Sequence, residues 1–234
     1  LPPNTTSIGT YAFSRCLTLN EITIPPSVNH IGSHAFEECS LLKKITINSP
    51  SISIEAYAFY GCSRLTELSI VYTNSINDFV FYECSLLQQI TIPSSVTLIG
   101  NNAFYGCRSL KQITIPSSVK LIRDHAFDQC SSLVQIEIPS SVTNIGSFSF
   151  SGCTLLKEIE IPSSITSIGD YTFNGCVSLK QITIPSSVKS IGNYAFYQCS
   201  SLVQISIPSS VKSIGEYAFY QCSSLVQISI PSSV

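Results

Sequence analysis

Short runs of alternating apolar and polar residues recur along the chain, and each predicts a strand that is buried on one face. In Gln112-Ile113-Thr114-Ile115 the two isoleucines fall on one side, and Gln112 and Thr114 fall on the other. Pro116 follows this run, and a proline follows most of the other runs. Because proline donates no backbone hydrogen bond, it ends the strand. We therefore expect a series of short strands whose outward residues are polar.

Two further apolar segments follow each strand, as the unit at residues 179–201 illustrates. This unit reads L-K-Q-I-T-I-P-S-S-V-K-S-I-G-N-Y-A-F-Y-Q-C-S-S. Val188 and Ile191 indicate a second short extended segment. The Ala-Phe pair and the Cys that follow are spaced to face inward from one tight helical or 3₁₀ turn.

A glycine precedes this turn in seven of the ten units, and Gly192 is an example. Glycine suits a corner with positive φ, so we expect that conformation here. The other three units carry Glu55, Asn77 and Arg123. Asn tolerates a positive φ, whereas Glu or Arg would cost about 1 kcal/mol there or would show that the φ is ordinary.

The ten cysteines reveal the period of the pattern. Each interval between them is 23 residues except the step from Cys62 to Cys84, which is 22. A fixed period between 20 and 29 residues is the signature of leucine-rich repeats. Because one unit buries too little to offset the entropy of ordering it, units must stack on one another. The sequence thus predicts one leucine-rich-repeat solenoid over residues 1–234, mainly β, with about ten coils, a parallel β ladder and short 3₁₀ or turn segments.

The same spacing bears on the state of the cysteines. Coils about 4.8 Å apart would permit disulfides by distance, but parallel side chains fit disulfide geometry poorly. Zinc needs ligands that converge, whereas these thiols are spread one per coil. Each Cys is flanked by a predicted core Phe and a core Leu, as a small buried apolar residue would be. We predict free, buried thiols, with no metal site and no cofactor.

The repeated motif resembles the BspA-like leucine-rich-repeat family, also called the Treponema pallidum type. The matching residues include Ile184-Pro185-Ser186-Ser187-Val188, the Ala195-Phe196 pair and Cys199, and the resemblance covers essentially the whole chain. Members of this family are mostly surface or secreted proteins of mucosal bacteria and protozoan parasites, and some bind fibronectin or fibrinogen. The resemblance implies an extracellular or cell-surface location and a macromolecular ligand. It names no particular ligand, because the shared residues are core residues.

Two units depart from the motif. The segment Asn48-Ser49-Pro50-Ser51-Ile52 scrambles the Ile-Pro-Ser-Ser-Val box, and the segment Val71-Tyr72-Thr73-Asn74-Ser75 is one residue short. The resemblance therefore does not determine the local curvature of the solenoid at these units.

Composition excludes several classes of function. The net charge is −2, which gives no electrostatic basis for binding nucleic acid. No apolar run approaches the roughly 18 residues of a membrane span, so no membrane insertion is expected within this segment. Only 11% of residues are charged, against about 25% in an ordinary domain, so the surface must be mostly neutral and polar. The chain has no Met and opens and stops within a repeat, so we expect it to be an excerpt of a longer protein.

Catalytic chemistry has one candidate. Glu137 and Glu160 occupy the same outward strand position in consecutive units, with Glu158 on the same face. Carboxylates about 5 Å apart could share a proton, hold Ca²⁺ or act as a retaining glycosidase pair. We expect this face to be an open sheet without a pocket or aromatic sugar platforms, and Lys157 and Lys180 to be near enough to neutralise the acids. A carbohydrate-active site is therefore a remote alternative, and we expect no enzyme. The three histidines lie too far apart in the repeat for a catalytic triad.

Tyrosines form repeated rows. Tyr60, Tyr82 and Tyr105 hold one outward position in consecutive units, as do Tyr197 and Tyr220, and Tyr171, Tyr194 and Tyr217 form a second column. Exposed tyrosines supply rigid contact area in binding sites. The alternative is that they cover the turn and shield the Phe layer.

The broadest regular surface predicted by the sequence is the outward face of the strands. A non-enzymatic binding module would hold a protein or matrix ligand there, and an inert spacer or stalk is the alternative. The candidate contact residues are Thr114, Glu137, Glu160 and Thr183, with Gln112, Gln135, Glu158 and Gln181 beside them and Tyr197 and Tyr220 as aromatic anchors.

Overall fold

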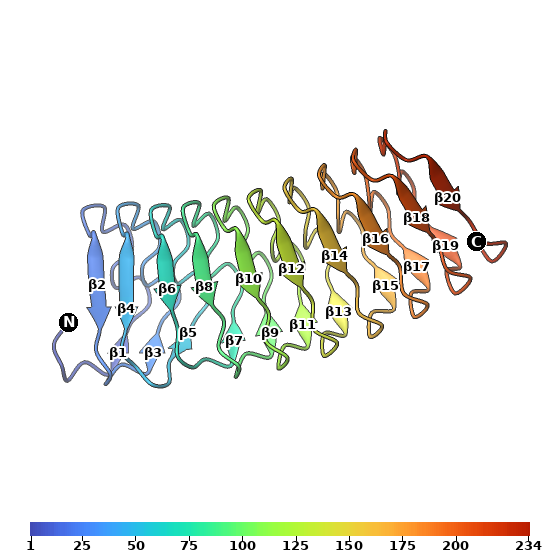
Figure 1. The fold of residues 1–234 in the computed structure, drawn as a ribbon. Coiled ribbons are helices and arrows are strands. Elements are labelled where there is room, and N and C mark those ends of the chain that lie inside the picture. Colours follow the sequence, from blue (N-terminus) through green and yellow to red (C-terminus); the bar gives the residue numbers. More distant parts are fainter.

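The computed structural model describes residues 1–234, apart from the side chain of Glu67. The chain winds into one continuous solenoid of about ten coils, with twenty short strands and no helix among the described residues. The coils lie side by side, and the two termini are at opposite ends (Figure 1). This confirms the predicted leucine-rich-repeat solenoid with a parallel ladder.

One side of every coil carries a strand of three or four residues. These ten strands form two adjoining parallel ladders, ordered β2-β4-β6-β8 and β10-β12-β14-β16-β18-β20. Their outward-facing side is called the long-strand face below. The strands are β2 (Glu21–Ile24), β4 (Lys44–Ile47), β6 (Glu67–Ser69), β8 (Gln89–Thr91), β10 (Gln112–Thr114), β12 (Gln135–Glu137), β14 (Glu158–Glu160), β16 (Gln181–Thr183), β18 (Gln204–Ser206) and β20 (Gln227–Ser229).

A second set of strands, each of two residues, lies next along the coil. It forms three parallel ladders, β1-β3-β5, β7-β9-β11-β13 and β15-β17-β19. The break between β5 and β7 falls at the shortened unit, where Thr73 stands buried in place of the core Val. The strands are β1 (Ser7–Ile8), β3 (His30–Ile31), β5 (Ser53–Ile54), β7 (Ser75–Ile76), β9 (Leu98–Ile99), β11 (Leu121–Ile122), β13 (Asn144–Ile145), β15 (Ser167–Ile168), β17 (Ser190–Ile191) and β19 (Ser213–Ile214).

The third side of each coil is a run of turns, and the expected helical or 3₁₀ turn is absent from the described residues. Two residues per coil take positive φ there, for example Tyr194 at 54° and Gln198 at 59°. The alternate backbone N–H groups of Tyr194, Phe196 and Gln198 donate to carbonyls of the next coil. A 3₁₀ turn would direct these donors to its own carbonyls, so stacking between coils replaces local helix.

The glycine before this turn does not have the positive φ expected for it. Gly192 has an ordinary φ, and Tyr194 two residues later takes the left-handed conformation instead. A Cβ on Gly192 would lie only 2.6 Å from the backbone N of Asp170 in the preceding coil, and it would also overlap the Asp170 carboxylate. At Gly192 glycine is therefore favoured by the close approach of Asp170 and not by a left-handed φ. Glu55 and Arg123 at the equivalent position also have an ordinary φ, so the repeat has no general conformational need for glycine there.

The core consists of columns of identical residues. Phe rings from consecutive coils stack with centroids 5.2 to 5.7 Å apart, and most of these rings are fully buried. All ten cysteines are free, and nine are buried, which confirms the prediction for those nine. Cys16 is only partly buried, because no coil stacks on its N-terminal side.

Candidate binding surface

The predicted contact residues of the long-strand face do lie together. Thr114, Glu137, Glu160 and Thr183 pair directly from β10 to β16, as do Gln112, Gln135, Glu158 and Gln181 beside them. All eight side chains are exposed, whereas the isoleucine between each pair, such as Ile136, is buried. The outward residues are therefore free of any role in the core.

The long-strand face is hollowed, which corrects the expectation of a sheet without a pocket. One hollow of about 1090 Å³ lies over β4 to β12, and another of about 1120 Å³ lies over β12 to β20. Glu137 lines both hollows, and Glu158 and Glu160 line the second. No aromatic residue is among the described residues that line either hollow.

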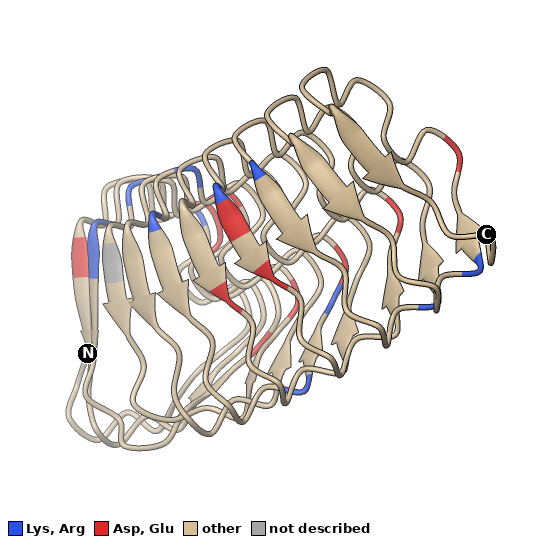
Figure 2. Ribbon diagram, turned by 45° about the vertical axis from the view of Figure 1, so that its right-hand side comes forward, with Lys and Arg blue, Asp and Glu red and all other residues tan. Residues whose placement is uncertain are grey.

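Charge is distributed unevenly over this face. Figure 2 shows acidic residues on β12 and β14, and basic residues at the upper end of β14 itself and of other strands of this face. Lys43 and Lys44 line the first hollow, and the carboxylates of Glu137, Glu158 and Glu160 line the second. Within the described part of the chain, these three carboxylates form no salt bridge and no group of three or more potential metal ligands is found. The three carboxylates are thus exposed acids without an ion-pair partner in the described part of the chain.

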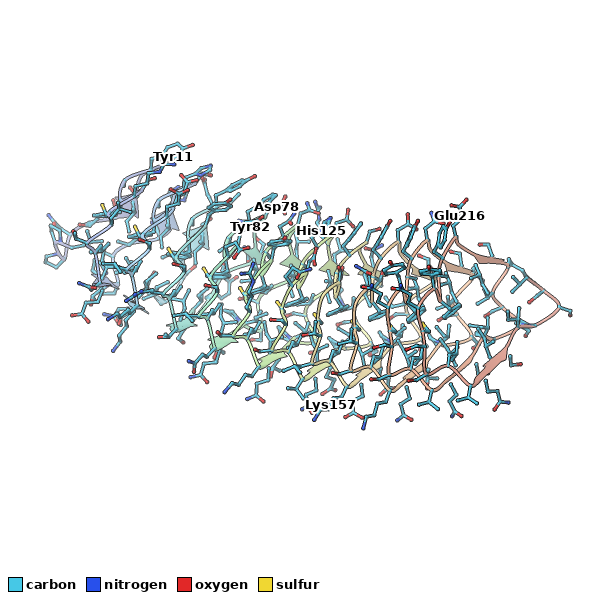
Figure 3. All side chains as sticks on the ribbon, turned by 90° about the horizontal axis from the view of Figure 1, so that it is seen from above. Tyr11, Asp78, Tyr82, His125, Lys157 and Glu216 are labelled. Atoms are coloured by element: carbon cyan, nitrogen blue, oxygen red, sulfur yellow. The ribbon has the colours of Figure 1, made fainter. Side chains whose placement is uncertain are left out.

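The proposed tyrosine anchors are not beside this face. Tyr197 and Tyr220 stack at 5.6 Å on the turn side of the coil, where Tyr197 is half-buried and Tyr220 is 50% exposed. Tyr82 holds the same repeat position. It lies on the side of the solenoid opposite Lys157, which directly precedes β14 (Figure 3). One compact partner domain could not contact both sets of residues through a single flat surface.

The tyrosines that directly follow the core Phe partly cover one another. Tyr60, Tyr82 and Tyr105 stack face to face at 4.6 to 4.7 Å. Desolvation raises the pKa of the Tyr82 phenol, and the neighbouring Tyr105 adds to this rise. Ring faces are thus used within the row and mainly ring edges remain for a partner, which agrees in part with the shielding alternative.

A longer aromatic column lies on the turn side, and the column of Tyr171, Tyr194 and Tyr217 predicted from the sequence is its C-terminal part. It consists of the residue two before each core Phe, and its signal was the 23-residue recurrence of an aromatic or His residue there. His34 stacks between Tyr11 and Tyr57, each at 4.6 Å, and His125 stacks on Phe148 at 4.4 Å. Two of the three histidines are therefore members of a stack. The column, called the aromatic column below, contains Tyr11, His34, Tyr57, Phe79, Asn102, His125, Phe148, Tyr171, Tyr194 and Tyr217.

The stacked 23-residue coils, the parallel ladders and the columnar core define a leucine-rich-repeat solenoid. The model of the BspA type leucine rich repeat region matches residues 1–86, 74–202 and 143–234. The chain belongs to this family, as its repeated motif indicated. Within the described residues no helix is long and apolar enough to cross a membrane.

Three solved structures show what the chain is similar to. A leucine-rich cell surface protein from Faecalibacterium prausnitzii is 30% identical, with a TM-score of 0.52 over 98% of this chain and 84% of that one. A leucine-rich repeat protein from Eubacterium ventriosum is 25% identical, with a TM-score of 0.62 over 98% and 77%. The pneumococcal vaccine antigen PcpA is 22% identical, with a TM-score of 0.60 over 98% and 64%, and shows likeness of fold alone. A comparison with curated proteins found no match.

Proposed function

We propose that the chain is a non-enzymatic binding module of a cell-surface or secreted protein. In this proposal the long-strand face holds a macromolecule, such as a host matrix protein of the fibronectin or fibrinogen kind or a component of a cell surface. The observation that carries it is the regular exposed ladder of Thr, Gln and Glu over two hollows, which plays no part in core packing.

The surface location is supported by likeness to known proteins. The similar structure from Faecalibacterium prausnitzii is described as a cell surface protein. The BspA-like resemblance points in the same direction. A scarcity of charge also suits a neutral recognition surface, where polar side chains form hydrogen bonds at low desolvation cost.

The proposal is tested by measuring binding of the whole 234-residue chain to immobilised fibronectin, fibrinogen and cells by surface plasmon resonance or adhesion assay. Reversal of charge at Glu137→Lys together with Glu160→Lys should weaken binding and leave thermal unfolding nearly unchanged, because both side chains are exposed. The matched control is Glu216→Lys, an exposed acid that lies on the side away from Lys157 (Figure 3). Equal effects of the two variants would contradict the choice of face.

The tyrosine anchors need a separate variant, since they lie on the turn side. Alanine at both Tyr197 and Tyr220 should weaken binding only if a ligand also reaches that side. If this variant lost binding and the glutamate variant kept its affinity, the binding site would be on the turn side and not on the long-strand face.

An inert spacer is the second candidate. It is favoured by the last two repeat copies, residues 186–208 and 209–231, which differ only at Asn193 and Glu216. Near-identical units add length without creating a singular site. Absence of binding to matrix protein, glycan or cells at micromolar concentration would support this candidate over the binding module.

A further inference from the structure

The aromatic column is interrupted at one coil. From Tyr57 to Phe79 and from His125 to Phe148 its rings stack at 4.5 and 4.4 Å. Between Phe79 and His125 the column position is Asn102, so two rings stand two coils apart with no ring between them. In this column Phe79 stacks only on Tyr57, and His125 stacks only on Phe148.

The backbone at the interruption is regular. Asn102 has a φ of 54°, within the 54° to 62° of the other column members. Its N–H donates to the Asp124 carbonyl of the next coil at 3.0 Å, as Phe79 N–H donates to the Asn101 carbonyl at 2.9 Å. The coils therefore keep their spacing here. The two flanking rings are therefore two steps of the column apart, with Asn102 at the position between them.

Both flanking rings are held in place by other contacts. Phe79 packs on Tyr57 and, tilted by 41°, against Tyr82 at 5.7 Å. The Nδ1 atom of His125 lies 2.9 Å from Oδ2 of Asp128, a carboxylate that is 5% exposed. Fixed rings lose little conformational freedom when a third ring joins them.

Asn102 does not replace a ring. Its amide is shorter than a phenyl or phenol group, so it fills only the inner part of the position that a ring fills in the other coils. Asn102, Phe79 and His125 are all half-buried, so the interruption opens to solvent. The amide could donate to a peptide carbonyl adjacent to an inserted ring.

We propose that the interruption at Asn102 is a docking site for one aromatic side chain of a partner protein. The ring enters between Phe79 and His125 and completes the stack at the centroid spacing that aromatic pairs prefer. A side chain on a polypeptide is the occupant because the site offers two ring faces and one peptide-bonding amide. The site lies on the turn side, and His125 is drawn opposite Lys157 in Figure 3, so it is separate from the long-strand face.

The site is tested by NMR titration of the whole chain with the peptide acetyl-Gly-Trp-Gly-amide, using acetyl-Gly-Leu-Gly-amide as control. The tryptophan peptide should shift the ring signals of His125 and Phe79 upfield, since ring currents act above an aromatic face, and the leucine peptide should not. The variant Asn102→Tyr fills the column from within, as Tyr57 does in its own coil, and should abolish these shifts. Equal shifts with both peptides, or shifts that persist in Asn102→Tyr, would overturn the proposal.

Two further variants keep the test decisive if Asn102→Tyr folds poorly. Asn102→Ala removes the amide but leaves the space open, so the tryptophan peptide should still shift His125. Tyr171→Asn creates a second interruption between Phe148 and Tyr194, which now stack on Tyr171 at 4.4 and 4.6 Å. It should add tryptophan-dependent shifts at Phe148. No new shifts in folded Tyr171→Asn would show that an interrupted column is not what binds.

Discussion

The Sγ atom of Cys130 lies 3.2 Å from the carbonyl oxygen of Phe104 in the preceding coil, and the thiol donates a hydrogen bond to this oxygen. The same contact recurs from Cys39 to Cys222, nine times in all. The cysteine column thus links coils by a weak polar contact, which a purely apolar residue could not make.

Replacing Cys130 with Ser should lower the free energy of unfolding by about 1–3 kcal/mol. The hydroxyl must be desolvated at a fully buried position, and the acceptor that the thiol uses, the Phe104 carbonyl, is shared with the Cys107 N–H at 3.1 Å. Urea denaturation measures the change. The control is Cys16→Ser in the partly buried first unit, which should cost no more than about 0.5 kcal/mol. Equal costs at the two positions would argue against burial as the cause.

Native thiols should resist alkylation to different degrees. Cys16, which is partly exposed, should react first with iodoacetamide. Burial raises the pKa of Cys39 and Cys222, in coils near the two ends, to about 11, and it also raises the pKa of Cys107 and Cys130, which lie in the middle of the stack. These thiols should follow in that order, and all ten should react after denaturation. Mass spectrometry after timed quenching gives the order, and a middle thiol reacting before Cys16 would refute it.

Stability should fall at alkaline pH. Unfolded thiols ionise near pH 9, whereas burial keeps folded Cys39 and Cys222 protonated up to a pKa of about 11. Between these values the folded state binds more protons than the unfolded state, so the free energy of unfolding decreases as pH rises. Chemical denaturation at pH 8, 9 and 10 measures the decrease. A free energy of unfolding that stays constant over this range would contradict it.

Gly192→Ala should destabilise the fold by about 1–3 kcal/mol, because the new Cβ would overlap Asp170 of the preceding coil. Gly9 holds the same repeat position in the first coil, and a Cβ there meets nothing within 4 Å. Gly9→Ala is therefore a matched control, with an expected change within about 0.5 kcal/mol. Thermal unfolding of the two variants compares them directly. If both variants lost the same stability, coil contact could not be the reason for the glycine.

Much of the fold follows from the 23-residue period. In a parallel stack, residues one period apart become neighbours, so the pairing of Glu137 with Glu160 could be predicted from the sequence alone. The burial of Ile136 and Cys130 could likewise be predicted, because alternation and flanking core residues identify the inward positions. Two units depart from the motif, and one of them is also one residue short. The sequence alone did not determine the path of the chain in these units.

Other features depended on the path of the chain within one coil. A period states which residues stack, but it does not state how each corner turns, because backbone dihedrals respond to hydrogen bonds from the next coil. The left-handed conformation therefore fell at Tyr194 and not at Gly192. The path of the chain within a coil also determines the hollows over the long-strand face. It likewise determines that Tyr197 and Glu160 lie on different sides of the solenoid. Both depend on how three sides of a coil close around the Phe column, which only the packed tertiary structure determines.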